Sequence, residues 1–131
     1  MGQLRFDPRC RAILLDAELG GSGQRRTYLR MVLDTGASFT VIPWDVAERL
    51  GLDPARSRRR MRFMTGSGME AAPVLVVNTL EVLGVCAAQV PVLCHDLPQR
   101  SFVDGLLGLS FLRQCRLSID FGQGILTLNK I

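Results

Sequence analysis

The chain has 131 residues and a formal net charge of +4, and this length suits a single domain. Hydrophobic residues make up 47% of the sequence, a content that excludes an intrinsically disordered chain. Almost all of the cations are arginines, and their densest cluster, from Arg56 to Arg62, has no aromatic residues interleaved for base stacking, which favours a solvated surface over a nucleic-acid site.

No run of about 18 apolar residues is present, so the sequence does not predict a membrane-spanning helix. The most apolar stretch, residues 71–94, is interrupted by Asn78, Glu81 and Gln89 and is typical of strands. No basic and apolar leader follows Met1. We therefore expect a soluble protein, with a cytoplasmic location favoured over a periplasmic one.

Short apolar and alternating segments, separated by glycine-rich turns, indicate a mostly β chain. We expect residues 1–9 to form an N-terminal arm and residues 10–131 to form one domain. Proline at its start and glycine after its end predict a short helix at 43–50, and a second brief helix is expected at 109–114. This pattern predicts a closed barrel or a folded sheet. The expected strands are residues 10–19, 27–33, 39–42, 60–64, 71–77, 80–85, 87–93, 116–121 and 125–129.

The four cysteines show no C-x-x-C spacing and have only His95 nearby, which argues against a zinc site. We expect neither a metal ion nor another cofactor. Cys86, Cys94 and Cys115 lie in apolar surroundings and are expected to be small core residues, although a disulfide stays possible.

One segment combines features that a buried strand does not need. The apolar run Met31–Leu33 leads directly into Asp34, Thr35 and Gly36, and an apolar pattern resumes at Phe39. An unpaired charge buried at the end of a strand would cost several kcal/mol. A turn at Gly36 would instead direct the Asp34 carboxylate into a cleft, which indicates a functional site.

The segment Leu33–Ser38 resembles the active-site loop of aspartic peptidases. Gly105–Leu109 resembles the glycine element that packs beneath this loop in the retropepsin-like branch, and Arg49–Leu52 and Leu107–Leu112 resemble segments of its bacterial single-domain members. The resemblance extends over roughly residues 10 to 130. It implies a retropepsin-like barrel with one or two short helices.

The resemblance also implies a mechanism. Peptide hydrolysis without a covalent intermediate needs one carboxylate that takes a proton from water and one carboxylic acid that donates a proton to the carbonyl oxygen. The chain has a single D-T-G motif, because Asp104 lacks the following hydroxyl and opens the glycine element. The family forms its pair of acids in a two-fold dimer, so Asp34 of each subunit would be catalytic.

Other residues receive roles through the same resemblance. Thr35 would lock the two loops across the axis, Gly36 would let the backbone approach the carboxylates, and Ala37 or Ser38 would tune the acid by hydrogen bonding. The structural glycine element would be formed by Gly105, Leu106, Leu107 and Gly108.

A hairpin with a glycine-rich tip is expected at residues 64–69. In the retropepsin-like resemblance this hairpin takes the place of the flap, which would close over an extended polypeptide substrate. Val41, Ile42, Val103 and Leu106 are expected to form pocket walls. His95 has no serine or cysteine nucleophile placed beside it and is expected in a loop or at the surface. The predicted flap residues are Met64, Thr65, Gly66, Ser67, Gly68 and Met69.

We thus expect an aspartic endopeptidase that acts as a homodimer. A peptide-binding module on the same fold, with weak or no catalysis, is the alternative. A third hypothesis is a basic nucleic-acid-binding barrel, but this hypothesis leaves the Asp34 loop unexplained.

Overall fold

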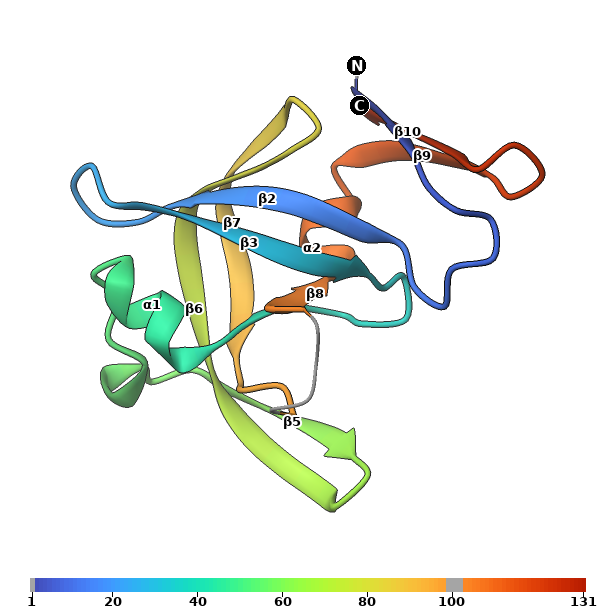
Figure 1. Cartoon of the computed structure of the whole chain (residues 1–131). Coiled ribbons are helices and arrows are strands. Elements are labelled where there is room, and N and C mark those ends of the chain that lie inside the picture. Colours follow the sequence, from blue (N-terminus) through green and yellow to red (C-terminus); the bar gives the residue numbers. More distant parts are fainter. Residues whose placement is uncertain (1, 99–102) are drawn as a thin grey trace.

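The computed structural model describes residues 2–98 and 103–131, which form a mostly β structure (Figure 1). Helices in these residues are short: α1 (Trp44–Arg49), α2 (Leu109–Leu112) and the 3-10 turn η1 (Pro54–Arg56). The prediction of a β fold with short helices at these two places is confirmed. The strands are β1 (Gly2–Arg5), β2 (Leu14–Gly20), β3 (Arg26–Leu33), β4 (Thr40–Ile42), β5 (Arg60–Thr65), β6 (Gly68–Val82), β7 (Val85–Cys94), β8 (Gly105–Leu107), β9 (Cys115–Asp120) and β10 (Ile125–Lys130).

Six of these strands close into a barrel in the order β2-β3-β8-β4-β7-β6, and β6 pairs back with β2 to complete the ring. The β3–β8 and β4–β7 pairs are parallel, whereas the other neighbours in the ring are antiparallel. Closure satisfies the backbone hydrogen bonds around the ring and leaves it without a free edge.

Strand β6 has 15 residues and serves two parts of the molecule. Its C-terminal part belongs to the barrel, while its N-terminal part pairs with β5 in a hairpin that projects from the barrel (Figure 1). We predicted two separate strands at 71–77 and 80–85, and this is wrong. The chain continues through Asn78, whose side-chain amide donates a hydrogen bond of 2.7 Å to the Gly21 carbonyl.

The first barrel strand is shorter than predicted. Residues 10–19 were expected to be extended, but β2 begins only at Leu14. The backbone N–H of Cys10 donates to the Asp7 carbonyl oxygen at 2.9 Å, which holds the preceding residues in a turn.

A second, three-stranded sheet has the order β1-β10-β9 and brings the two ends of the chain together (Figure 1). Strand β1 lies within the N-terminal arm and pairs antiparallel with β10, with Gly2 opposite Leu128. Leu126 and Leu128 of β10 are fully buried. This sheet therefore joins the terminal segments to the core.

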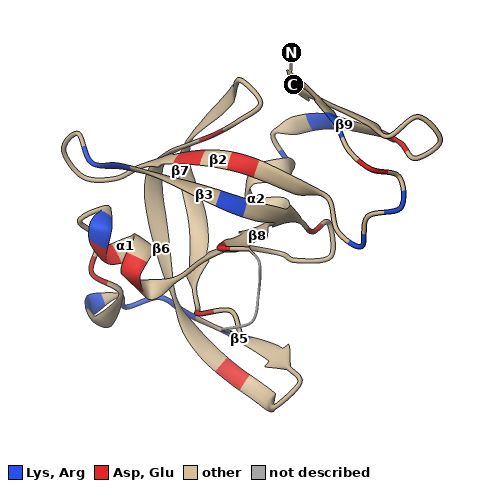
Figure 2. Ribbon diagram, viewed as in Figure 1, with Lys and Arg blue, Asp and Glu red and all other residues tan. Residues whose placement is uncertain are grey.

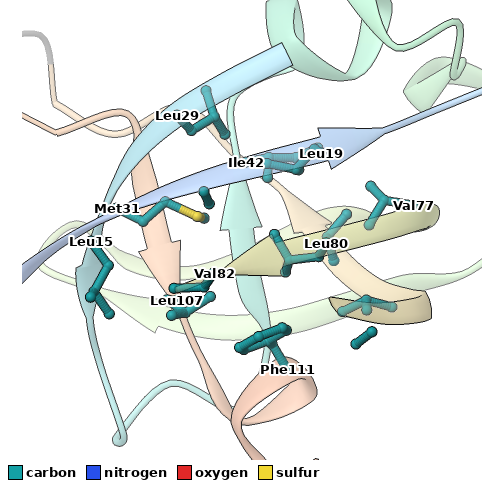
Figure 3. Close-up of a cluster of buried hydrophobic side chains, with 14 of the residues drawn as sticks. Leu15, Leu19, Leu29, Met31, Ile42, Val77, Leu80, Val82, Leu107 and Phe111 are labelled. Carbon is teal, nitrogen blue, oxygen red and sulfur yellow. The ribbon is translucent and has the colours of Figure 1, made fainter. Parts of the chain in front are cut away.

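The barrel interior is filled by side chains that alternate along its strands (Figure 3). Leu15 and Leu19 come from β2, Leu29 and Met31 from β3, and Phe111 of α2 is fully buried against them. Each such side chain contributes roughly 1.5–3 kcal/mol through burial. The period-two alternation explains why these segments form strands with one inward face.

All four cysteines are free, and two of them are exposed while the other two are buried. Cys94 and Cys115 are buried as predicted, but the prediction that Cys86 is a core residue is wrong. It lies on β7 between Val85 and Ala87, whose side chains point inward, so alternation turns Cys86 outward. Burial, followed by the nearby charges of Asp96, Glu48 and Asp45, raises the pKa of the Cys94 thiol to about 12.

We predict that two thiols of the folded protein, Cys10 and Cys86, react quickly with a thiol reagent near pH 8, because both are exposed. Cys94 and Cys115 should react only on unfolding, because burial raises the pKa of both and suppresses the thiolate. Time-resolved Ellman titration, with and without denaturant, measures this. Fast reaction of the Cys86→Ser variant at more than one thiol would contradict it.

Gly105 is the point at which β8 fits between β3 and β4. Its neighbours allow no side chain, because a Cβ there would overlap the Val41 carbonyl oxygen and lie 3.1 Å from Cε of Met31. This close approach explains why glycine opens the strand.

We predict that Gly105→Ala lowers the free energy of unfolding by about 1–3 kcal/mol, because β8 must shift away from β4. Gly66→Ala is the matched control, since a Cβ at Gly66 has nothing within 4 Å. Urea titration followed by circular dichroism measures both variants. Equal stability of the two would show that β8 has room to adjust.

Candidate active site

Asp34 follows the last residue of β3 and lies at the ends of two parallel strands. Leu33 of β3 is opposite Leu107 of β8, and the backbone N–H of Asp34 donates to the Leu107 carbonyl oxygen at 2.9 Å. The backbone N–H of Ala37 then donates back to the Asp34 carbonyl oxygen at 3.2 Å. These two bonds turn the chain sharply and hold the start of the loop.

Asp34 as a residue is half-buried, and one oxygen of its carboxylate has a partner inside the loop. The backbone N–H of Gly36 donates to Oδ1 of Asp34 at 3.0 Å. A Cβ at Gly36 would come within 3.3 Å of that oxygen, so a larger residue would crowd the carboxylate. Thr35 is exposed beside it. The loop thus presents a carboxyl group that has one backbone donor and is partly exposed to solvent.

The structural glycine element packs directly beneath this loop. The backbone N–H of Leu109 donates to the Ala37 carbonyl oxygen at 2.8 Å. A Cβ at Gly108 would overlap the Phe39 carbonyl oxygen and lie 2.7 Å from that of Ala37, so only glycine fits without a shift. The predicted element therefore supports the loop from below through its backbone.

Two hydroxyl groups that sequence reasoning missed join these segments. The backbone N–H of Gly108 donates to Oγ1 of the fully buried Thr40 at 3.1 Å. In return, the backbone N–H of Thr40 donates to Oγ of Ser110 at 2.9 Å. A polar residue at the start of the apolar strand 40–42 is a signal that could have pointed to Thr40.

A cavity of about 980 Å³ lies beside the loop. Its floor comes from the Asp34 loop and from strands β4, β7 and β8, and the β5–β6 hairpin and the segment after β7 form its sides. Asp34 does not line it, but the residues that follow Asp34 do. Most of the remaining lining is apolar. The lining residues are Gly36, Ala37, Ser38, Phe39, Val41, Met61, Arg62, Phe63, Met64, Thr65, Gly66, Ser67, Leu93, His95, Asp96, Leu97, Pro98 and Leu106.

The predicted pocket walls are correct in two of four positions. Val41 and Leu106 line the cavity, whereas Ile42 is fully buried in the barrel core and Val103 is not among the lining residues. Strand alternation explains the difference between Val41 and Ile42, because neighbours in β4 point to opposite faces.

The predicted flap residues form the tip of the β5–β6 hairpin. Met64 to Ser67 line the cavity, whereas Gly68 and Met69 do not. Oγ1 of Thr65 accepts from the backbone N–H of Ser67 at 3.1 Å and donates to the Gly68 carbonyl oxygen at 3.1 Å, which closes the turn. The side chains of Met64 and Met69 are largely exposed.

His95 lies at the cavity and touches the hairpin. Its ring meets that of Phe63 edge to face, with centroids 4.9 Å apart, and its Nε2 lies 3.9 Å from Oε2 of Glu70. Phe63 and Glu70 are opposite one another in the hairpin. His95 therefore connects the end of β7 to both arms of the hairpin.

Asp104 has a structural role at the start of β8. Its Oδ2 accepts from the backbone N–H of Arg30 at 2.9 Å, and its own N–H donates to the Arg30 carbonyl oxygen at 2.7 Å. These bonds tie the start of β8 to β3 and leave this carboxylate engaged away from the Asp34 loop.

Comparison with known proteins agrees with this geometry. The model of a protein family described as aspartyl protease matches residues 15–111. Among solved structures, the chain is similar to a retropepsin-like aspartic protease from Rickettsia conorii, with 22% identity and a TM-score of 0.69, over 98% of this chain and 99% of that one. A comparison with curated proteins gives no match. In the described residues, no helix has the length and apolar character to cross a membrane. The resemblance to retropepsin-like aspartic peptidases is thus confirmed, and the chain belongs to the aspartyl protease family and has the retropepsin-like fold.

Proposed function

We propose that this protein is an aspartic endopeptidase whose catalytic pair consists of Asp34 from two copies of the chain. The observation that carries the proposal is the Asp34 loop itself: the half-buried Asp34 is held at the ends of β3 and β8, next to a large and mostly apolar cavity. An aspartate kept in this position has no role in packing the barrel.

The chemistry needs a second carboxyl group beside Asp34, and the chain has only one D-T-G motif to supply it. Among the described residues that line the cavity, Asp96 is the one carboxylate, and its Oδ1 accepts from the backbone N–H of Trp44 at 3.0 Å. Asp104 is engaged with Arg30. Two-fold pairing of Asp34 loops supplies two acids that share one proton, the arrangement that lets one act as base and the other as acid.

In this proposal, Thr35 is exposed so that its hydroxyl can bond to the partner loop, and Ala37 and Ser38 shape the surroundings of the acid. The β5–β6 hairpin acts as the flap. It projects from the barrel, so its tip can move while the barrel keeps its shape. An extended polypeptide would lie between the flap and the loop and bind as an added strand.

The alternative is a peptide-binding module with the same cavity and little or no catalysis. The retained Asp34–Gly36 geometry favours the enzyme, because a binder has no need for an acid supported in this way.

We predict that Asp34→Asn lowers kcat/KM for peptide cleavage by at least about a hundredfold, because the pair loses its shared proton. Asp16→Asn is the matched control, since its side chain is 81% exposed on β2. Mass spectrometry of a peptide library, digested at mildly acidic pH, measures both variants. Undiminished cleavage by Asp34→Asn would refute the assignment, and binding of peptides by the wild type without cleavage would favour the alternative.

A site shared by two chains also predicts that an Asp34→Asn chain inactivates the wild-type chain with which it pairs. When wild-type chains are refolded with an equal amount of Asp34→Asn, about half of the wild-type chains pair with the variant, and activity per wild-type chain should fall to about half. Adding Asp16→Asn in place of Asp34→Asn should cause no loss. Activity that is independent of added Asp34→Asn would mean that each chain works alone.

A further inference from the structure

The arginine cluster of the sequence lies at the base of the β5–β6 hairpin, next to the cavity. We define the basic strip as Arg58, Arg59, Arg60 and Arg62, on the segment that leads from η1 into β5, where cations gather in Figure 2. Arg62 lines the cavity. Cζ of Arg59 lies 5.7 Å from the ring centroid of Phe39, which also lines the cavity. The strip therefore reaches the cavity through Arg59 and Arg62, and all four of its arginines are exposed.

The charges of the basic strip are not balanced within the described residues. The fifth arginine of the cluster, Arg56, pairs with Asp53 at 3.3 Å. The ion pairs found in residues 2–98 and 103–131 include none of the four arginines of the strip. The hairpin carries one acid, Glu70, and its carboxylate faces His95 at 3.9 Å. The four arginines of the strip thus outnumber the acids next to them, which are Glu70 and the cavity-lining Asp96.

We propose that the basic strip selects peptide substrates in which Asp or Glu flanks a large apolar residue, an inference that rests on the proposed function. The apolar side chain enters the cavity between Phe39, Val41 and Phe63, where burial stabilises it. A neighbouring carboxylate then reaches the guanidinium groups at the rim. Arginine suits this role because its planar fork binds a carboxylate through two parallel hydrogen bonds.

The strip favours an acidic peptide over a nucleic acid because of what lies next to it. The cavity floor is apolar, and a substrate must place an apolar group there while its charge stays at the rim. Nucleic-acid surfaces without sequence preference combine cations with a series of stacking rings. Here Phe39 is already covered by Arg59, and Phe63 packs edge to face against His95.

The test compares three peptides that share one apolar core and differ in the flanking residues, which are Asp and Glu, Asn and Gln, or Lys and Arg. At about pH 6, where free Asp and Glu are ionised, kcat/KM should be highest for the acidic peptide, by about two- to fivefold for each acidic residue. Added salt should reduce this preference without affecting the neutral peptide. Equal rates for the acidic and neutral peptides would overturn the proposal.

Variants of the strip make the test specific. Arg62→Gln should reduce the preference for the acidic peptide, and Arg62→Glu should reduce it further, because three arginines of the strip remain. Arg26→Gln is the matched control, because Arg26 is a 58% exposed cation at the start of β3, outside the cavity lining. An acidic preference that is the same in Arg62→Glu as in the wild type would overturn the proposal.

A binding measurement separates this proposal from the proposed function. Fluorescence anisotropy with Asp34→Asn and the same labelled peptides detects selection without cleavage. Preferential binding of the acidic peptide, together with a wild type that does not cleave, would support the strip and refute the enzyme. Cleavage without any effect of flanking charge would do the reverse. Tighter binding of a single-stranded oligonucleotide than of the acidic peptide, lost in Arg62→Glu, would assign the strip to nucleic acid instead.

Discussion

The position of the Asp34 carboxylate depends on the backbone contact between its loop and the glycine element of β8 and α2. At one end of the loop, the Asp34 N–H donates a hydrogen bond to the Leu107 carbonyl oxygen of β8. At the other end, the Leu109 N–H of α2 donates to the Ala37 carbonyl oxygen. Gly108 lies between these bonds, and its lack of a side chain lets the two segments touch. Because both partners are backbone groups, the geometry leaves little freedom for the acid to move.

The rest of the molecule combines a closed barrel, which carries this loop, with a hairpin that projects from it. The closed barrel surrounds a continuous core and carries the loop on two of its parallel strands. The hairpin shares β6 with the barrel, yet its tip makes its hydrogen bonds within itself, through Thr65. His95 and the apolar side chains of β5 connect the hairpin to the cavity wall. The hairpin and the barrel that carries the acid are therefore joined through one continuous strand, β6.

Sequence reasoning predicted the parts of this structure that local chemistry determines. The D-T-G loop, the glycine turns of the hairpins and both helices follow from residues that are near one another in the chain. The continuity of β6 through Asn78 could not be predicted, because the partner that satisfies its amide is the carbonyl of Gly21, far away in the sequence. The Thr40–Gly108 and Thr40–Ser110 bonds were missed for the same reason. Cys86 was misplaced because an apolar neighbourhood does not say which face of a strand a residue occupies.

The pairing of β2 with β6 has a consequence for how the chain folds. This seam joins Ala17 to Val82 and Gly20 to Thr79, so it unites segments that are synthesised far apart. The hairpins β2–β3, β6–β7 and β9–β10 need only short turns and can assemble early. Closing the ring, by contrast, costs chain entropy before the favourable contacts of the closed ring can form. We therefore expect the ring to close after these hairpins have formed, through the long-range pairings β2–β6 and β3–β8, the second of which fixes the strand that precedes Asp34.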